Sequence, residues 1–178
     1  MKRREFVAAA GASTALAGCA SLPALSGSQD CERTEIVDTA ELGRFGGFSM
    51  TASPETVAKG EEITIRMENA TESDQITGNR HKFTIHEQAD SGWQSVYATT
   101  EHMGWPDIAF EHEPREGFTW TVTASKPGFS SAPNNLNACA TVTPGTYRFV
   151  YWGVSSNDEN TSNEEAADGV GVEFTVAE

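Results

Sequence analysis

An all-β antiparallel sandwich is the fold class that the sequence predicts, and three observations support it. Residues 62–68 alternate strictly, so that Ile63, Ile65 and Met67 share one face of a strand. Clusters of Gly, Pro, Asn and Asp, such as the one at 144–145, punctuate the chain at short intervals. No sustained apolar stripe of helical period follows the first 18 residues. About seven short strands separated by turns are typical of a sandwich.

The N-terminal residues predict an export signal and a lipid anchor. Lys2, Arg3 and Arg4 precede an apolar run at 6–17, which is shorter than the roughly 20 residues that a membrane-spanning helix needs. The Arg-Arg-x-Phe core resembles a twin-arginine signal, and the Leu-Ala-Gly-Cys that ends at Cys19 resembles a lipobox. The alternative is an uncleaved amphipathic N-terminus.

These features divide the chain into three parts. We expect a twin-arginine lipoprotein signal at 1–18, a lipidated Cys19 with a flexible tether at 19–30, and one sandwich domain at 31–178. The domain is then exported and held by lipid on the outer face of the cytoplasmic membrane.

The charge of the chain is strongly negative. With 12 basic and 26 acidic residues its formal net charge is −14. Cleavage before Cys19 removes three basic residues and one acidic residue, which leaves 9 and 25 and a net charge of −16. Such a surface repels nucleic acid, so no nucleic-acid partner is expected. It resembles the surfaces of salt-loving prokaryotes, where concentrated salt screens the self-repulsion; a mesophilic acidic secreted protein is the alternative.

The cysteine count fits export. Cys19 is assigned to lipid, which leaves Cys31 and Cys139 as a disulfide pair for an oxidising compartment. Closing a loop of that length contributes about 4–5 kcal/mol through the entropy of the unfolded chain. The alternative is two free thiols, one of them a metal ligand.

The domain's strands follow in chain order from the same pattern of apolar runs and turns. After the alternating strand at 62–68, Phe118, Trp120 and Val122 share a face, as do apolar residues of the last strand. Three long loops are expected, at 99–117, 124–144 and 155–168. The expected strands cover residues 45–53, 62–68, 82–87, 94–98, 118–123, 146–153 and 170–176.

Metal sites are weakly indicated. A blue-copper centre needs a cysteine, a histidine and an axial ligand near the C-terminus. Cys139 instead precedes the strand at 146–153, and no His or Met follows it, which excludes that centre. His102 and His112, in one acidic loop, are the remaining metal candidates, although their spacing matches no dense metal motif.

No catalytic or cofactor motif is present. The chain lacks a Gly-x-Ser-x-Gly elbow, a His-Glu-x-x-His pair and a phosphate-cradling glycine loop. The sequence therefore predicts a protein that is not an enzyme and has no cofactor.

Surface sites are suggested at three positions. Trp105, followed by Pro106 in a loop, is a candidate partner-binding residue. The alternative is that it folds over the end of the sandwich as a plug. Asn69 and Asn160 begin glycosylation tripeptides in expected turns.

The segments GEEITIRMEN (60–69), 83–87, Gly92-Trp93, FTW (118–120), PGTYRFV (144–150) and VEFTV (172–176) resemble, in order and spacing, the Ig-like domains of small bacterial and archaeal envelope lipoproteins. The resemblance covers roughly residues 47–177. It implies a non-catalytic binding or structural module, and we expect its partner to be another envelope component or an extracellular protein. Tyr147 is then a candidate tyrosine corner. Two other functions stay open: a metal-binding surface lipoprotein that uses the loop histidines, and a protease inhibitor, since inhibitor sandwiches share this outline.

Overall fold

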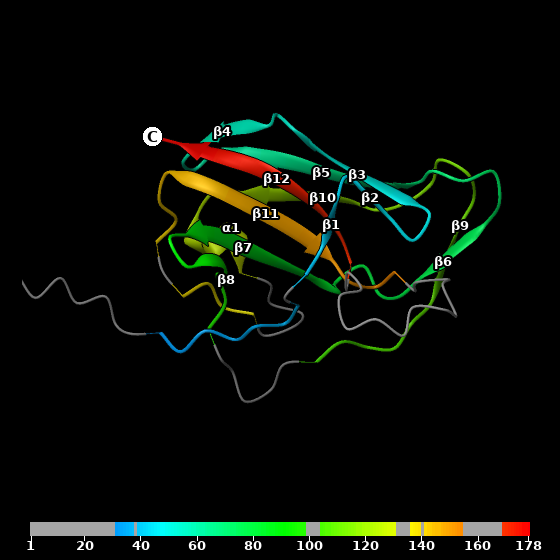
Figure 1. Ribbon diagram of the computed structural model, residues 1–178, viewed down its shortest axis with the longest axis horizontal. Helices are drawn as coiled ribbons and strands as arrows, with labels where there is room; N and C mark the ends of the chain where they lie inside the picture. Colours follow the sequence, from blue (N-terminus) through cyan, green and yellow to red (C-terminus); the bar gives the residue numbers. More distant parts are fainter. Residues whose placement is uncertain (1–30, 38, 99–103, 131–135, 140, 155–168) are drawn as a thin grey trace, which may run out of the picture.

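The computed structural model describes residues 31–37, 39–98, 104–130, 136–139, 141–154 and 169–178. The expected signal peptide, the lipidation site Cys19, the tether, His102 and Asn160 lie outside the described residues. The described part is almost entirely β, as the sequence predicts, and its strands form two sheets and a short ribbon (Figure 1).

The first sheet has the order β1-β12-β11-β7-β8, and β4 also pairs with β12. β11 lies at its centre, antiparallel to both β12 and β7. Its strands are β1 (Glu41–Leu42), β4 (Thr56–Ala58), β7 (Phe83–Ala89), β8 (Gly92–Ser95), β11 (Gly145–Tyr151) and β12 (Val170–Ala177).

The second sheet has the order β10-β5-β3-β2, and all its neighbours are antiparallel. Beside it, β6 and β9 form a separate two-stranded ribbon. These strands are β2 (Arg44–Phe45), β3 (Phe48–Ser53), β5 (Glu62–Asn69), β6 (Gln75–Thr77), β9 (Phe110–His112) and β10 (Thr119–Thr123). Among the described residues, seven of the twelve strands have four or more residues, which matches the predicted number of about seven.

The alternating residues of β5 supply buried side chains from the second sheet to the core. Ile63, Ile65 and Met67 are buried while the residues between them face outward. Burying such side chains stabilises the fold by about 1.5–3 kcal/mol each. Trp120 of β10 lies opposite Ile65 in the register and packs against Phe149 of the first sheet, with ring centroids 5.0 Å apart. The hydrophobic core therefore lies between the two sheets, where the sequence pattern predicted it.

The structure departs from the expected sandwich in its shortest elements. β1 and β4 pair in parallel with β12, so the sandwich is not wholly antiparallel. The expected loop at 124–144 contains a one-turn helix, α1 (Lys126–Phe129), capped by the Ser125 side chain, which accepts a hydrogen bond from the Gly128 backbone N–H. Elements of two to four residues are too short to show a period, which is why the sequence did not reveal them.

The tyrosine corner suggested by the sequence is present. The Tyr147 hydroxyl donates to the Thr143 carbonyl at 2.8 Å and accepts from the Thr143 backbone N–H at 3.1 Å. These two bonds fix the chain as it enters β11.

The two ends of the domain along its long axis are formed by different elements. In Figure 1 the blue segment that begins at Cys31 lies at one end of the long axis, near β8, and the β6–β9 ribbon projects at the other. Within the described residues, no helix is long and apolar enough to cross a membrane.

Candidate functional site

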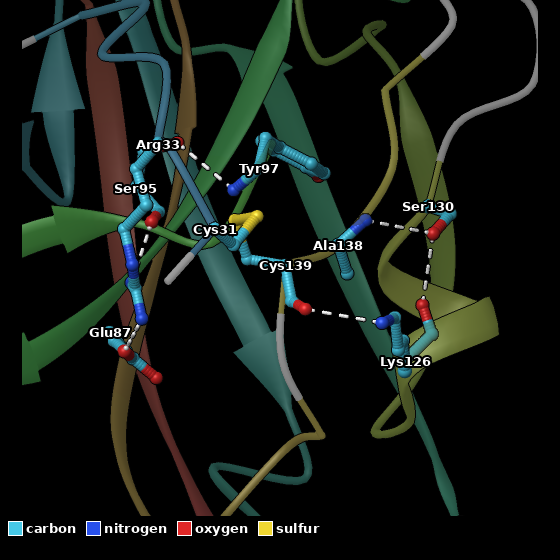
Figure 2. Close-up of a disulfide and its surroundings, with 9 residues drawn as sticks. All are labelled: Cys31, Arg33, Glu87, Ser95, Tyr97, Lys126, Ser130, Ala138 and Cys139. Carbon is cyan, nitrogen blue, oxygen red and sulfur yellow. Dashed lines mark hydrogen bonds and ion pairs between the residues drawn. A yellow bond between two sulfur atoms is a disulfide. The ribbon is translucent and has the colours of Figure 1, made fainter. Parts of the chain in front are cut away.

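Three segments are joined at the Cys31 end, and we call this region the clasp: residues 31–35, 95–98 and 136–139. The Thr34 N–H donates to the Tyr97 carbonyl at 3.0 Å, and the Ala98 N–H donates to the Asn137 carbonyl at 2.8 Å. Cys31 and Cys139 form the disulfide that the cysteine count predicted, with their Cα atoms 5.6 Å apart (Figure 2). The bond thus ties the start of the domain to a segment 108 residues further along the chain.

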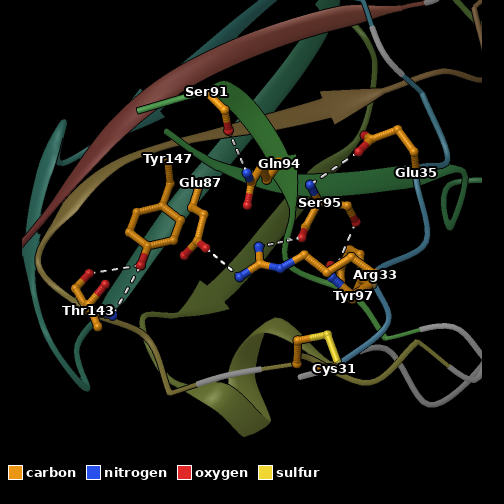
Figure 3. A network of polar contacts seen from close by, with 11 residues as sticks. Cys31, Arg33, Glu35, Glu87, Ser91, Gln94, Ser95, Tyr97, Thr143 and Tyr147 are labelled. Atoms are coloured by element: carbon orange, nitrogen blue, oxygen red, sulfur yellow. Dashed lines mark hydrogen bonds and ion pairs between the residues drawn. A yellow bond between two sulfur atoms is a disulfide. The ribbon is translucent and has the colours of Figure 1, made fainter. Parts of the chain in front are cut away.

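An arginine of the clasp reaches two groups at once. Arg33 pairs with the Glu87 carboxylate at 2.6 Å and also donates to the Ser95 carbonyl at 2.7 Å (Figure 3). Glu87 is on β7 and Ser95 is on β8, so one guanidinium bridges the N-terminal segment to two strands. Because both side chains of the ion pair are only partly exposed, the pair is screened less than a surface pair would be.

A buried histidine lies behind this ion pair. His86 is 0% exposed, and it faces Arg148 directly in the β7–β11 register. Arg148 Nε donates to His86 Nδ1 at 2.7 Å, so the proton of the neutral ring is on Nε2, which lies 3.0 Å from the Glu35 carboxylate. Burial lowers the pKa of His86 to about 3, and the charge of Arg148 adds to this shift. His86 is therefore neutral at ordinary pH.

The arrangement of Glu35, His86 and Arg148 shares one contact with catalytic triads, namely a carboxylate that accepts from a histidine ring N–H. In a triad the other ring nitrogen takes a proton from a nucleophile. Here that nitrogen accepts a hydrogen bond from an arginine, whose guanidinium stays protonated and cannot act as a nucleophile. The cluster is suited to joining the N-terminal segment to the first sheet.

His112, a metal candidate, is engaged elsewhere. It is buried on β9, its Nε2 lies 2.8 Å from the Thr77 hydroxyl, and its ring packs edge-on against Phe48 and Phe118. Burial lowers its pKa. The described residues include no group of three or more His, Cys, Asp or Glu side chains that could hold a metal ion. His112 thus lies on a strand and not in the expected loop, and its ring forms part of the packed interior.

Asn69 also differs from expectation. The sequence placed it in a turn where it could carry a glycan, but it is the last residue of β5 and is 1% exposed. Its amide nitrogen donates to the Ser73 and His112 carbonyls at 2.8 and 2.9 Å. The folded domain therefore does not offer this nitrogen for glycosylation.

Trp105 is not the exposed contact that its loop position suggested. Its Nε1 donates to the His81 carbonyl at 2.7 Å, and its ring lies edge-on to Trp152 with centroids 5.1 Å apart. The side chain is half-buried against the core, which agrees with the plug alternative.

Two isoleucines near Trp105 are the more exposed apolar residues of this region. Ile108 is 48% exposed, and Ile76 on β6 is 63% exposed. Both line a hollow of about 260 Å³ whose wall includes Trp152 and Val154; we call it the ribbon hollow. At its rim, Lys82 Nζ lies 3.9 Å from Asp107 and over the Trp152 ring. The ribbon hollow thus combines an apolar surface with both signs of charge.

The sequence did not identify the residues of either region in full. Ile76 lies in a three-residue strand, and Ile108 lies in the segment at 99–117 that was expected to be a long loop. Arg148 lies between the core residues Tyr147 and Phe149 and is also buried, because it donates to His86 and packs over the Trp93 ring. A histidine and an arginine on two expected strands, at 82–87 and 146–153, are the signal that could have pointed to this polar cluster.

Comparisons with known proteins add little to this description. No family model and no curated protein matches the chain. Solved structures with a partial likeness include a β-glucosidase from Erythrobacter marinus, at 13% identity and a TM-score of 0.37, and one from Listeria innocua with gluconolactone, at 16% and 0.32. Each match covers 74% of this chain but only 15% and 16% of the respective enzyme. At these values the likeness carries no argument.

Proposed function

We propose that the chain is a lipid-anchored, exported binding module of the cell envelope, that it is not catalytic, and that its Ig-like domain contacts an envelope partner through the ribbon hollow. The observation that carries the proposal is the exposure of Ile76 and Ile108 around one hollow, at the end of the domain far from Cys31. Apolar residues around a shaped hollow are a usual feature of protein interaction sites.

The position of the hollow fits an anchor at Cys19. Twelve residues, 19–30, separate that cysteine from the domain, and when extended they span at most about 40 Å. The chain then leaves the membrane and enters the domain at the clasp. The opposite end of the domain, with the ribbon hollow, points away from the membrane. The disulfide supports this role, since it fixes the residue through which the anchor would hold the domain.

The anchor is tested by the intact mass of the protein extracted from native membranes with detergent. Cleavage before Cys19 with an added lipid is expected, and a Cys19→Ser variant serves as the control that is released from the membrane. A full-length mass, or an anchored Cys19→Ser variant, contradicts the anchor.

The binding surface is tested with membranes from cells that lack the protein. In the Cys19→Ser background, which removes the lipid anchor, the Ile108→Asp variant is expected to lose binding to these membranes in concentrated salt, while Leu42→Asp keeps it. Leu42 is the matched control, because it is 51% exposed but lies on β1, outside the ribbon hollow. Equal losses in both variants, or none in either, contradict the ribbon hollow as the contact.

A further inference from the structure

A second hollow, of about 480 Å³, lies where the ends of β2, β3 and β5 meet the turn at residues 113–116. Its volume is in the range of small-molecule sites. We call it the arginine hollow, after Arg44 and Arg115. Its lining includes Arg44, Ser49, Glu68, Thr71, Glu72 and Arg115.

These two arginines differ from six of the other seven basic residues that the structure describes. Arg33, Arg66 and Lys82 face carboxylates at 2.6, 3.1 and 3.9 Å. Three more donate to carbonyls or to a ring nitrogen: Arg80, Lys126 and Arg148.

By contrast, the guanidinium groups of Arg44 and Arg115 form no hydrogen bond or ion pair with any part of the chain that the structure describes. Acidic residues outnumber basic ones by 26 to 12, so carboxylate partners are abundant. Two arginines without a partner in one hollow are therefore unexpected for this composition. Only Lys59 shares this state among the described residues, and it lies outside the arginine hollow.

The charge inside the arginine hollow is favourable for an anion. Glu68 is already held by Arg66, whose Nε lies 3.1 Å from its carboxylate. Glu72 is the remaining acid in the lining, so two free guanidiniums face one free carboxylate.

The backbone at Arg115 supports a role for its side chain. The turn begins at Glu113, whose carbonyl accepts from the Glu116 N–H at 2.9 Å, and it carries Pro114 at its second position. Arg115 occupies the third position with φ of 73°, where glycine or asparagine is the usual residue. An arginine held in this conformation costs conformational energy, and such outliers gather at functional sites.

The turn is also fixed in place. The Arg115 N–H donates to the Asn69 carbonyl at 2.8 Å, and the Asn69 N–H donates to the Glu116 carbonyl at 2.6 Å. The Asn69 side chain also accepts from the Thr71 N–H at 3.0 Å and from its hydroxyl at 2.8 Å. The lining is thus held by hydrogen bonds before any ligand arrives, which lowers the entropy cost of binding.

We propose that the arginine hollow binds an oxyanion group, a carboxylate or a sulfate or phosphate ester, carried by a small ligand or a chain end. The guanidinium fork matches the oxygens of these groups. A polyanion does not fit, because the net charge of the domain repels it at long range. The site does not depend on the ribbon hollow or on the lipid anchor, and it stands or falls without them.

The test is an NMR titration of the ¹⁵N-labelled full chain that carries Cys19→Ser, with acetate, sulfate and phosphate in turn. Sodium chloride keeps the ionic strength constant. We expect saturable shifts at the amides of Ser49, Thr71 and Arg115 with at least one anion, and the anion that binds best separates carboxylate from sulfate or phosphate ligands.

Variants decide whether the site is specific. Arg115→Gly is expected to weaken the affinity by about ten-fold or more while the protein melts at the same or a higher temperature, since glycine suits the backbone. Lys59→Gln, which removes a free cation outside the hollow, is expected to bind as the parent does. Shifts that never saturate, shifts that scatter over the surface, or equal losses in Arg115→Gly and Lys59→Gln overturn the proposal.

Discussion

The clasp and the ribbon end of the domain use similar residue types in opposite ways. At the clasp and on the strands β7 and β11 next to it, Arg33, Glu35, His86 and Arg148 contact one another or the backbone, and a disulfide closes the clasp. Towards the ribbon end, Ile76 and Ile108 are exposed, and the guanidiniums of Arg44 and Arg115 lack partners among the described residues.

Side chains that satisfy one another stabilise a fold, whereas side chains left exposed or without partners do not. The contrast therefore teaches that stability is concentrated where the chain enters the domain, and that the ribbon end is available for recognition. Substitutions at the two ends should then affect different measurements.

The largest effect is expected from the disulfide. Replacing Cys31 and Cys139 by alanine removes a link between residues 108 apart, and should lower the free energy of unfolding by about 4–5 kcal/mol. Urea unfolding of the parent and the double variant measures the loss. A reductant should destabilise the parent by a similar amount and leave the variant unchanged; a reductant that affects both equally would act elsewhere.

The next effect is a dependence on pH. Burial lowers the pKa of His86 to about 3, so the folded state holds fewer protons than the unfolded state between that value and the usual pKa of 6.5. Stability is therefore fully present above pH 6.5 and falls by about 1.4 kcal/mol for each unit below it, until pH approaches 3.

Urea midpoints measured from pH 7.5 to 4 test this dependence. A His86→Gln variant is expected to be less stable at pH 7.5 but to lose stability less steeply on acidification. An identical slope in the parent and His86→Gln would assign the effect to other groups.

A smaller loss of stability is expected when Arg148 is replaced, and Arg80, which makes similar contacts, is the control. Arg148 donates to His86 and lies over the Trp93 ring, and Arg80 donates to the Thr119 carbonyl and lies over the Phe118 ring. Arg148 is buried and Arg80 is exposed. Arg148→Met should cost about 1.5–3 kcal/mol and Arg80→Met less than about 1 kcal/mol, measured by thermal unfolding. Equal costs would show that burial at the clasp adds nothing.

A further loss is expected at the tyrosine corner. Tyr147→Phe removes the two hydrogen bonds to Thr143 and should destabilise the domain by about 1–2 kcal/mol in urea unfolding. A variant as stable as the parent would mean that water replaces both bonds without cost.

The smallest effect is expected at the ribbon hollow. Ile76→Asp changes a side chain that is 63% exposed. The free energy of unfolding of this variant, measured in urea, should stay within about 0.5 kcal/mol of that of the parent. A large loss would place Ile76 in the core and remove the contrast between the two ends.

The sequence predicted the regular part of the fold because its physics is local. The alternation in β5 and the shared face of Phe118, Trp120 and Val122 both lead to buried side chains, as expected. A period of two over five or more residues needs no knowledge of distant partners.

The parts that sequence reasoning missed depend on distant contacts. Arg148 is buried beside His86 of β7 and the Trp93 ring of β8, which lie more than 50 residues earlier in the chain. Asn69 was expected in a turn, but His112 of β9, 43 residues away, supplies one of the carbonyls that hold its amide. Arg44 and Arg115 likewise line one hollow although they are far apart in the sequence, and no local sequence pattern predicts that they lie close together.

Site-specific photocrosslinking in native membranes tests the division of roles most directly. A crosslinking residue is placed at position 108 beside the ribbon hollow, or at position 90, an exposed site in the β7–β8 turn near the clasp. A partner that binds at the ribbon end should give one discrete adduct from position 108 and none from position 90. An adduct from position 90 alone would contradict the assignment and place recognition at the clasp.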